Sequence, residues 1–149
     1  MRRGTSALAW YERGLALEST DPSAAIAAYE RALAGRPDLA DANNNLGRLL
    51  HDAGQLAEAE ARYRQALAAD DAVALYHFNL GVVLEDSGRA AEAIAAYERA
   101  LAIDAHLADA HYNLARQLEQ QGRAADDELT LRRAVRHLKQ YKQLVRTAG

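Results

Sequence analysis

Two sets of side chains in this sequence could do chemistry: the histidines and a series of regularly spaced asparagines. His106 and His111 are five residues apart, whereas two imidazoles share one face of a helix when they are four apart. The sequence contains no cysteine, and it has no glycine-rich phosphate loop, no HExxH motif and no nucleophile elbow. We therefore expect no enzyme activity, no metal and no cofactor. Structural or surface roles are expected for His51, His77, His106, His111 and His137.

The asparagines suggest binding chemistry, because Asn45, Asn79 and Asn113 recur at intervals of 34 residues. A carboxamide donates and accepts hydrogen bonds, so it can hold a peptide backbone without reading its side chains. Packed helices lie about 8–10 Å apart and an extended chain rises about 3.3 Å per residue, so one Asn could hold roughly every third residue. The alternative is that each Asn bonds within the protein itself. Asn43 and Asn44 do not recur, and we expect them to be polar surface residues.

The elements that would position these asparagines form an internal repeat. The stretches NNLGRLLHDAG (44–54), FNLGVVLEDSG (78–88) and YNLARQLEQQG (112–122) align without gaps, and AEAEARYRQALAAD (57–70) matches AEAIAAYERALAID (91–104). Abundant alanine, only two prolines and few β-branched residues favour helices over sheet. Each repeat therefore reads as a first helix, a turn at Gly54, Gly88 or Gly122, and a second helix.

This pattern resembles the tetratricopeptide repeat (TPR) family, whose helix–turn–helix carries Leu-Gly, a turn glycine, and then alanine, an aromatic residue and alanine. The matching residues are Leu46, Gly47, Gly54, Ala59, Tyr63 and Ala66, followed by Leu80, Gly81, Gly88, Ala93, Tyr97 and Ala100. The small residues let two helices approach closely while Leu and Tyr fill the space between them. The resemblance implies an all-α TPR solenoid of four helix-turn-helix pairs in a right-handed superhelix. We expect a single TPR domain over residues 1–149, with repeats at about 6–39, 40–73, 74–107 and 108–146.

The two ends depart from the strict repeat. A first helix over residues 8–18 fits with Gly14 in the Leu-Gly position if the turn before Asp21-Pro22 is one residue shorter. At the other end, an unbroken 34-residue spacing would place the charge of Asp127 in a tightly packed position, which is costly. Seven extra residues before Leu131 instead place Ala134 there and Leu138 at the aromatic position. We therefore predict an extended last helix, from about Asp126 to Arg146.

In TPR proteins the first helices line a concave groove, and the resemblance therefore implies a peptide site. The same Asn position grips extended peptide in several members, including the O-linked N-acetylglucosamine transferases. The Lys/Asn clamp of the chaperone-binding TPRs is not found here. The implied ligand is an extended peptide with an apolar anchor and an acidic group, although packing between adjacent first helices is the alternative for the apolar residues. The expected peptide-binding residues are Asn45, Asn79, Asn113, Arg48, Leu75, Phe78, Val82, Tyr112 and Arg116.

Net charge and hydropathy limit the classes of partner that the protein can have. The formal charge is −3 and the pI is near 5.9, so we expect no nucleic acid and no membrane partner. No apolar run approaches the ~20 residues of a membrane span, and the apolar part of MRRGTSALAW is too short for a signal peptide. A cytoplasmic location is therefore expected. The basic run near the C-terminus is interpreted as a solvated helix face, with an acidic partner or nucleic acid as the alternative.

The function implied by the resemblance is a protein–protein interaction module or scaffold that binds an extended peptide or partner segment. The alternative is a self-associating or architectural segment of a larger protein, with a second copy as partner. The stretch YERGLALESTDPSAAIAAYERAL resembles TPR regions that follow MerR-type DNA-binding domains in some bacterial regulators. No DNA-binding helix-turn-helix is present in the sequence.

Overall fold

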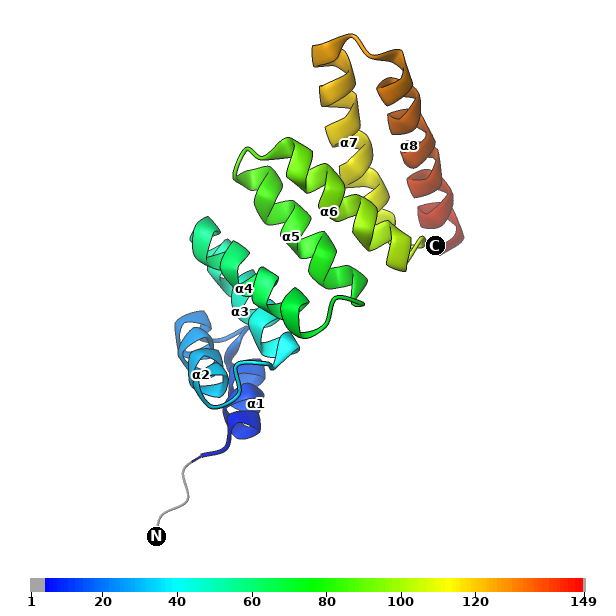
Figure 1. Ribbon diagram of the computed structural model, residues 1–149. Helices are drawn as coiled ribbons and strands as arrows, with labels where there is room; N and C mark the ends of the chain where they lie inside the picture. Colours follow the sequence, from blue (N-terminus) through cyan, green and yellow to red (C-terminus); the bar gives the residue numbers. More distant parts are fainter. Residues whose placement is uncertain (1–4, 149) are drawn as a thin grey trace. The chain divides into compact units, whose positions relative to one another are not determined.

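The computed structural model describes residues 5–148, and the remaining residues of the domain expected over 1–149 lie outside this range. The described residues form eight α-helices and no strand (Figure 1), which confirms the predicted all-α fold of four helix pairs. The helices are α1 (Ala7–Leu17), α2 (Pro22–Gly35), α3 (Ala40–Asp52), α4 (Leu56–Ala69), α5 (Ala74–Asp86), α6 (Ala90–Ile103), α7 (Ala108–Ala125) and α8 (Glu128–Ala148).

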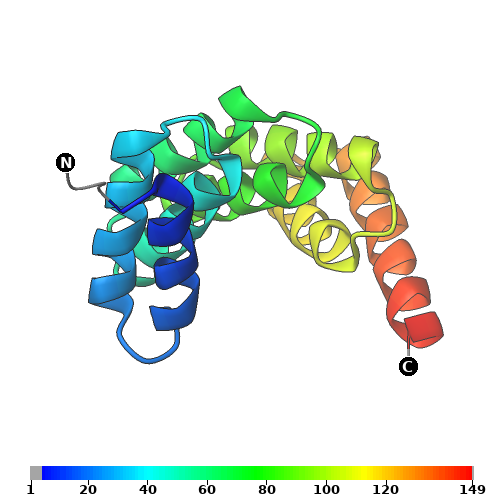
Figure 2. The ribbon, with the colours of Figure 1, turned by 90° about the horizontal axis from the view of Figure 1, so that it is seen from below.

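The helices fall into two compact units, which are described separately. Unit 1 holds α1–α4 and ends at Ala72, and unit 2 begins at Val73 and holds α5–α8. In each unit a first helix packs against the second helix of its pair, and the second pair packs against the first through α2 and α3 or through α6 and α7. Figure 2 shows the pair α1 and α2 as neighbouring helices joined by a short turn at one end.

Local signals place most helix ends where the sequence predicts them. The Asp21 carboxylate accepts a hydrogen bond from the Ala24 backbone N–H at 3.1 Å, and Pro22 occupies the first turn of α2. This is a side-chain N-cap, which satisfies a backbone donor that has no partner inside the helix. After α3 and α5 the chain turns at Gly54 and Gly88, whose φ angles are +80° and +77°. Glycine adopts this left-handed conformation without steric cost.

Gly122 does not form a turn, and that part of the sequence prediction was wrong. Helix α7 continues through Gly122 to Ala125, and the chain reverses at Asp126, which has a φ of 52°. A Cβ atom on Gly122 would lie 2.8 Å from Cγ of Leu131. The glycine is therefore needed for the close approach of α7 and α8 rather than for the turn. The last helix starts at Glu128, two residues later than predicted, and Asp127 caps it by accepting from the Thr130 backbone N–H.

The core of each of the first three pairs is a glycine on the first helix packed against a tyrosine on the second. A Cβ atom on Gly14, Gly47 or Gly81 would lie 2.5–2.8 Å from the nearest ring atom of Tyr29, Tyr63 or Tyr97. The contact at Gly14 confirms the register predicted for the first repeat. Ala134 is the buried residue of α8, which confirms the seven-residue insertion in the last repeat.

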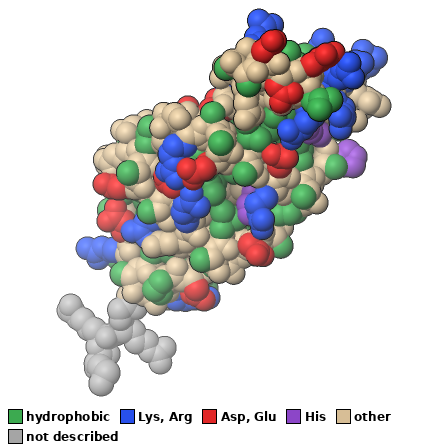
Figure 3. Space-filling view, turned by 45° about the horizontal axis from the view of Figure 1, so that its top comes forward, with side chains coloured by type: hydrophobic (Ala, Val, Ile, Leu, Met, Phe, Trp, Pro, Cys, Tyr) green, Lys and Arg blue, Asp and Glu red, His purple; other side chains and the backbone are tan. Residues whose placement is uncertain are grey.

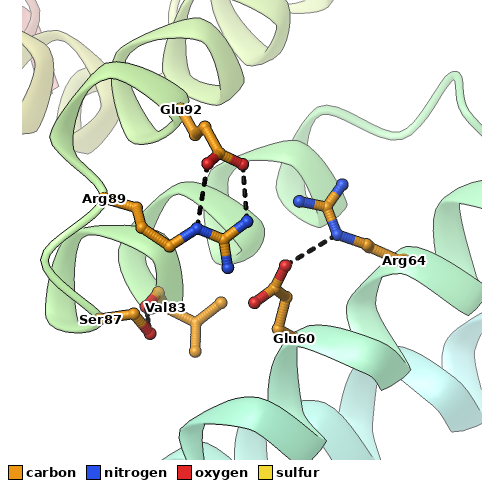
Figure 4. Close-up of polar contacts among 6 residues, drawn as sticks. All are labelled: Glu60, Arg64, Val83, Ser87, Arg89 and Glu92. Atoms are coloured by element: carbon orange, nitrogen blue, oxygen red, sulfur yellow. Dashed lines mark hydrogen bonds and ion pairs between the residues drawn. The ribbon is translucent and has the colours of Figure 1, made fainter.

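Local ion pairs lie on α4 and at the start of α6. Arg64 Nε lies 2.9 Å from Glu60 Oε2, and the Arg89 guanidinium reaches both oxygens of Glu92 (Figure 4). Pairs between residues three or four apart that keep contact with solvent contribute about 0–1 kcal/mol. The stability of the fold therefore rests on the packing of tyrosine, leucine and alanine between helices.

Candidate functional site

Asn43 and Asn44 are both buried, so the prediction that they are polar surface residues was wrong. Asn43 Nδ2 donates a hydrogen bond to the Pro37 carbonyl at 3.1 Å. His111 occupies the same repeat position, and its Nε2 lies 2.8 Å from the carbonyl of Ala105, also six residues upstream. This position therefore holds the turn that enters α3 and the turn that enters α7. The histidines at 77 and 111 were the sequence signal for it, since a polar side chain recurs there.

The asparagine series takes part in a hydrogen-bonded network inside unit 2. The Tyr97 hydroxyl donates to Glu85 Oε1 at 3.0 Å, and the Arg116 guanidinium donates to Glu85 Oε2 at 2.5 Å. Asn113 Nδ2 lies 3.4 Å from the Tyr97 hydroxyl oxygen. Burial raises the pKa of the Tyr97 hydroxyl, and the Glu85 carboxylate raises it further. The hydroxyl therefore stays protonated and serves as the donor that joins α5, α6 and α7.

Unit 1 repeats the same arrangement. The Arg48 guanidinium donates to both carboxylate oxygens of Glu18 at 2.8 and 2.9 Å, and the Tyr29 hydroxyl donates to the same carboxylate. Asn45 lies close enough to the Tyr29 hydroxyl to lower its pKa, which burial and Glu18 raise. We call each set of Glu, Tyr, Asn and Arg a joint network, because it links one helix pair to the first helix of the next. The sequence could not reveal these networks, since their members are up to 31 residues apart.

The joint networks bear on the predicted peptide site. Arg48 and Arg116 are each paired with a partly buried carboxylate, so their charges are already matched within the protein. Asn45 and Asn113 are half-buried, and Asn113 is bonded to Tyr97, which favours the alternative that this position bonds within the repeats. Asn79 is also half-buried. Peptide binding by these residues stays a prediction.

The predicted apolar residues differ in how much surface they offer. Leu75 on α5 and Tyr112 on α7 are about half exposed. Phe78 and Val82 are partly buried, and the Phe78 ring packs on Tyr97 with its centroid 5.7 Å away. Phe78 thus packs on the second helix of its own pair, which differs from the packing between adjacent first helices that the alternative proposed. Leu75 and Tyr112 remain accessible on the first helices of unit 2.

Tyr112 and Arg116 also line a cleft between α7 and α8, which we call the α7–α8 cleft. Its volume is about 500 Å³. Side chains on α7 form one wall, and Leu131, Ala134, Val135 and Leu138 on α8 form the other. Figure 3 shows hydrophobic side chains together with Lys and Arg at the upper right of the view, where the last helix pair lies. The cleft is mainly apolar, with the charges of Arg116, Glu119 and Arg123 along one side.

A histidine pair lies where α8 packs on α7. The Nδ1 atoms of His111 and His137 are 2.9 Å apart. Because His111 Nε2 faces a carbonyl oxygen, it carries the proton. His111 Nδ1 is then the acceptor, and His137 Nδ1 is the donor. Burial, together with the nearby His111, Arg133 and Arg136, lowers the pKa of His137 to about 4. Among the described residues, no three His, Asp or Glu side chains are grouped so that they could hold a metal ion.

Comparisons with known proteins support the repeat assignment. Residues 38–105 match a family model described as Tetratricopeptide repeat. The match covers the second and third helix pairs, which carry the Leu-Gly, glycine-turn and tyrosine pattern most completely. No curated protein sequence matches the chain. In the part of the chain that the structure describes, no helix is long and apolar enough to cross a membrane.

Solved structures show the same fold at low sequence identity. A crystal structure of MamA superposes with a TM-score of 0.85 at 20% identity, covering 95% of this chain and 80% of that one. MamA 41-end from Desulfovibrio magneticus RS-1 gives 0.81 at 22% identity, covering 95% and 77%. The first TPR of Spaghetti (RPAP3) bound to the HSP90 peptide SRMEEVD gives 0.75 at 19% identity, covering 78% and 94%. The chain therefore has a tetratricopeptide-like fold.

Proposed function

We propose that the protein is an interaction module that binds an extended peptide or partner segment on the first helices of its repeats. The observation that carries the proposal is the exposed apolar surface of Leu75 and Tyr112, on two first helices of a tetratricopeptide-like fold. Exposed apolar surface of this kind marks interaction sites. The structural neighbour bound to an HSP90 peptide gives a precedent for peptide binding by this fold.

The asparagines supply the backbone contacts in this proposal. The bond from Asn113 Nδ2 to Tyr97 uses one donor of the carboxamide, and an amide side chain has a second donor and an acceptor oxygen. Because Asn113 is only half-buried, that remaining capacity faces a ligand. Asn45 and Asn79 occupy the same repeat position as Asn113, and both are likewise half-buried.

We do not carry over the prediction that the ligand contains an acidic group. Arg48 and Arg116 would have to leave Glu18 and Glu85 to bind it, and each pair is partly buried. The glutamate side chains are only 16–20% exposed, so releasing either one leaves a largely buried carboxylate without its partner, which opposes the exchange. The ligand we propose is therefore selected by an apolar side chain beside Leu75 and Tyr112, with no requirement for acid. Attachment to a regulator of the MerR type stays a prediction from the sequence.

The test is calorimetric titration of a peptide panel in which the apolar anchor is large, small or absent. Leu75→Ser should weaken ligands with a large anchor by about tenfold or more, as expected for the loss of ~1–2 kcal/mol of apolar contact. The triple variant Asn45→Ala, Asn79→Ala, Asn113→Ala should lower the affinity for every peptide of the panel similarly, because all the peptides have the same backbone. Ile103→Ser is the matched control, because Ile103 is equally exposed but lies on the second helix α6.

Two results would count against the proposal. Equal loss of affinity in Leu75→Ser and Ile103→Ser would place the apolar contact elsewhere. Tight binding of the acidic peptide SRMEEVD, with no response to Leu75→Ser, would show recognition of acid rather than of an apolar anchor.

A further inference from the structure

The α7–α8 cleft corresponds to a surface that another helix covers inside the same unit. Ile94 on α6 lies 41 residues before Val135 on α8, which is one repeat plus the seven-residue insertion. Ile94 is 7% exposed because α7 packs on α6, whereas Val135 is 52% exposed. The fold therefore identifies the kind of element that fits the cleft. It is the first helix of a further repeat, since a first helix covers the equivalent surface in both units.

Helix α1 is a first helix whose equivalent face is exposed. Leu8 and Leu15 are 51% and 46% exposed. Leu15 occupies the repeat position of Arg48 and Arg116, the two arginines of the joint networks. In those networks the arginine meets a glutamate beside a tyrosine hydroxyl. In the cleft the tyrosine position is taken by Leu138, which has no hydroxyl. The glutamate position is held by Glu119, which lines the cleft and is paired with Arg123 on its own helix. A leucine on the incoming helix therefore packs on Leu138, and Glu119 already has its arginine.

Charge sets a limit on which surfaces can pair. Helix α8 carries six Lys and Arg residues and one Glu, whereas residues 1–39 carry five acidic and five basic residues and so have no net charge. Like charges on two surfaces oppose their contact. The basic helix α8 is therefore better matched to the first pair of a second copy than to another α8.

We propose that helix α1 of a second copy packs into the α7–α8 cleft, so that copies associate head to tail and continue the repeat. The contact is heterologous, because the surface that one copy offers differs from the surface that it meets. Such contacts do not limit themselves to a dimer unless a ring closes. The cleft shares Tyr112 with the proposed peptide site. The inference does not rest on that site, because it is argued from Leu15 and Val135, which belong to neither the asparagine series nor the residues around Leu75.

Sedimentation velocity and light scattering on the full chain provide the test. The wild-type protein should show a weight-average mass that rises with concentration above the 16.2 kDa of one copy. Leu15→Glu places a charge on the incoming face of α1, and Val135→Glu places a charge in the cleft. Each variant alone should therefore remain at the mass of one copy. Leu129→Glu is the matched control, because Leu129 is an exposed leucine on α8 outside the cleft. It should associate like the wild type.

Mixing the two variants separates this arrangement from any symmetric one. In an equimolar mixture, the intact α1 of Val135→Glu can dock in the intact cleft of Leu15→Glu, and the resulting pair cannot extend. The mixture should therefore reach twice the mass of one copy and no more. A wild type that stays at one copy up to its solubility limit would overturn the proposal. A mixture that fails to form the pair, or a Leu129→Glu variant as defective as Val135→Glu, would overturn it too. Unchanged circular dichroism in all variants shows that these changes leave the fold intact.

Discussion

The close contact between Gly81 and Tyr97 predicts how a single methyl group would affect unit 2. A Cβ atom at position 81 would lie 2.5 Å from Tyr97 Cε1, 2.7 Å from Cδ1 and 3.1 Å from Cζ. The ring is fully buried and its hydroxyl is bound to Glu85, so it cannot move aside easily. Overpacking of this kind costs about 1–3 kcal/mol. The better helix propensity of alanine returns up to about 1 kcal/mol, so Gly81→Ala should lower the free energy of unfolding by roughly 1–2 kcal/mol.

The last repeat provides an internal precedent for relieving this strain. It has Ala115 at the glycine position and Leu138 at the tyrosine position, so a methyl group and a smaller partner occur together. Tyr97→Leu should therefore remove the cost of Gly81→Ala, although Tyr97→Leu is itself destabilising because it breaks the joint network. The expected coupling between the two substitutions is about 1–2 kcal/mol, within the range found for residues in contact.

The assay is urea unfolding followed by far-ultraviolet circular dichroism. With a urea dependence of about 2 kcal/mol per molar, Gly81→Ala should lower the midpoint by roughly 0.5–1 M. Gly35→Ala is the control, because a Cβ atom at Gly35 would make only an ordinary contact at 3.4 Å with Ala7 Cβ. The reasoning would be refuted if Gly81→Ala and Gly35→Ala behaved alike. It would also be refuted if Gly81→Ala remained as costly in the Tyr97→Leu background.

Two further predictions concern buried polar side chains. Asn43→Ala should destabilise by about 1–3 kcal/mol in thermal or urea unfolding, because it leaves the Pro37 carbonyl without its donor. Asn43→His should be tolerated, since His111 makes the equivalent bond; a histidine as harmful as alanine would contradict this account. The folded-state pKa of His137 is lowered to about 4, so its neutral form stabilises the fold fully above pH ~6.5 and this contribution is lost as the pH falls toward 4. Because His137 is only half-buried, the loss should be about 1–2 kcal/mol. His137→Gln should flatten the fall of the melting temperature between those pH values, and an unchanged slope would contradict the assignment.

The sequence alone determined the helices and their pairing, because the signals involved are local and repeated. The 34-residue period, the glycines at 54 and 88 and the Asp21-Pro22 start each fix backbone conformation over a few residues. The glycine–tyrosine pattern also determined which faces meet within a pair, since a residue without a side chain opposite a large ring allows only one close packing. The burial of Ala134 followed from the same rule, because a charge at its position would have been costly.

Tertiary structure alone decided what the polar residues do. The sequence predicted that Asn44 is a polar surface residue and that Arg48 binds a peptide, yet Asn44 is buried and Arg48 binds Glu18, which lies 30 residues earlier in the chain. Gly122 looked like a turn because its two counterparts are turns, but the approach of Leu131 holds it inside α7. In each case the deciding partner lies on another helix. The periodicity of one helix specifies which residues share a face, whereas the partner of each polar side chain depends on how the next helix packs across it.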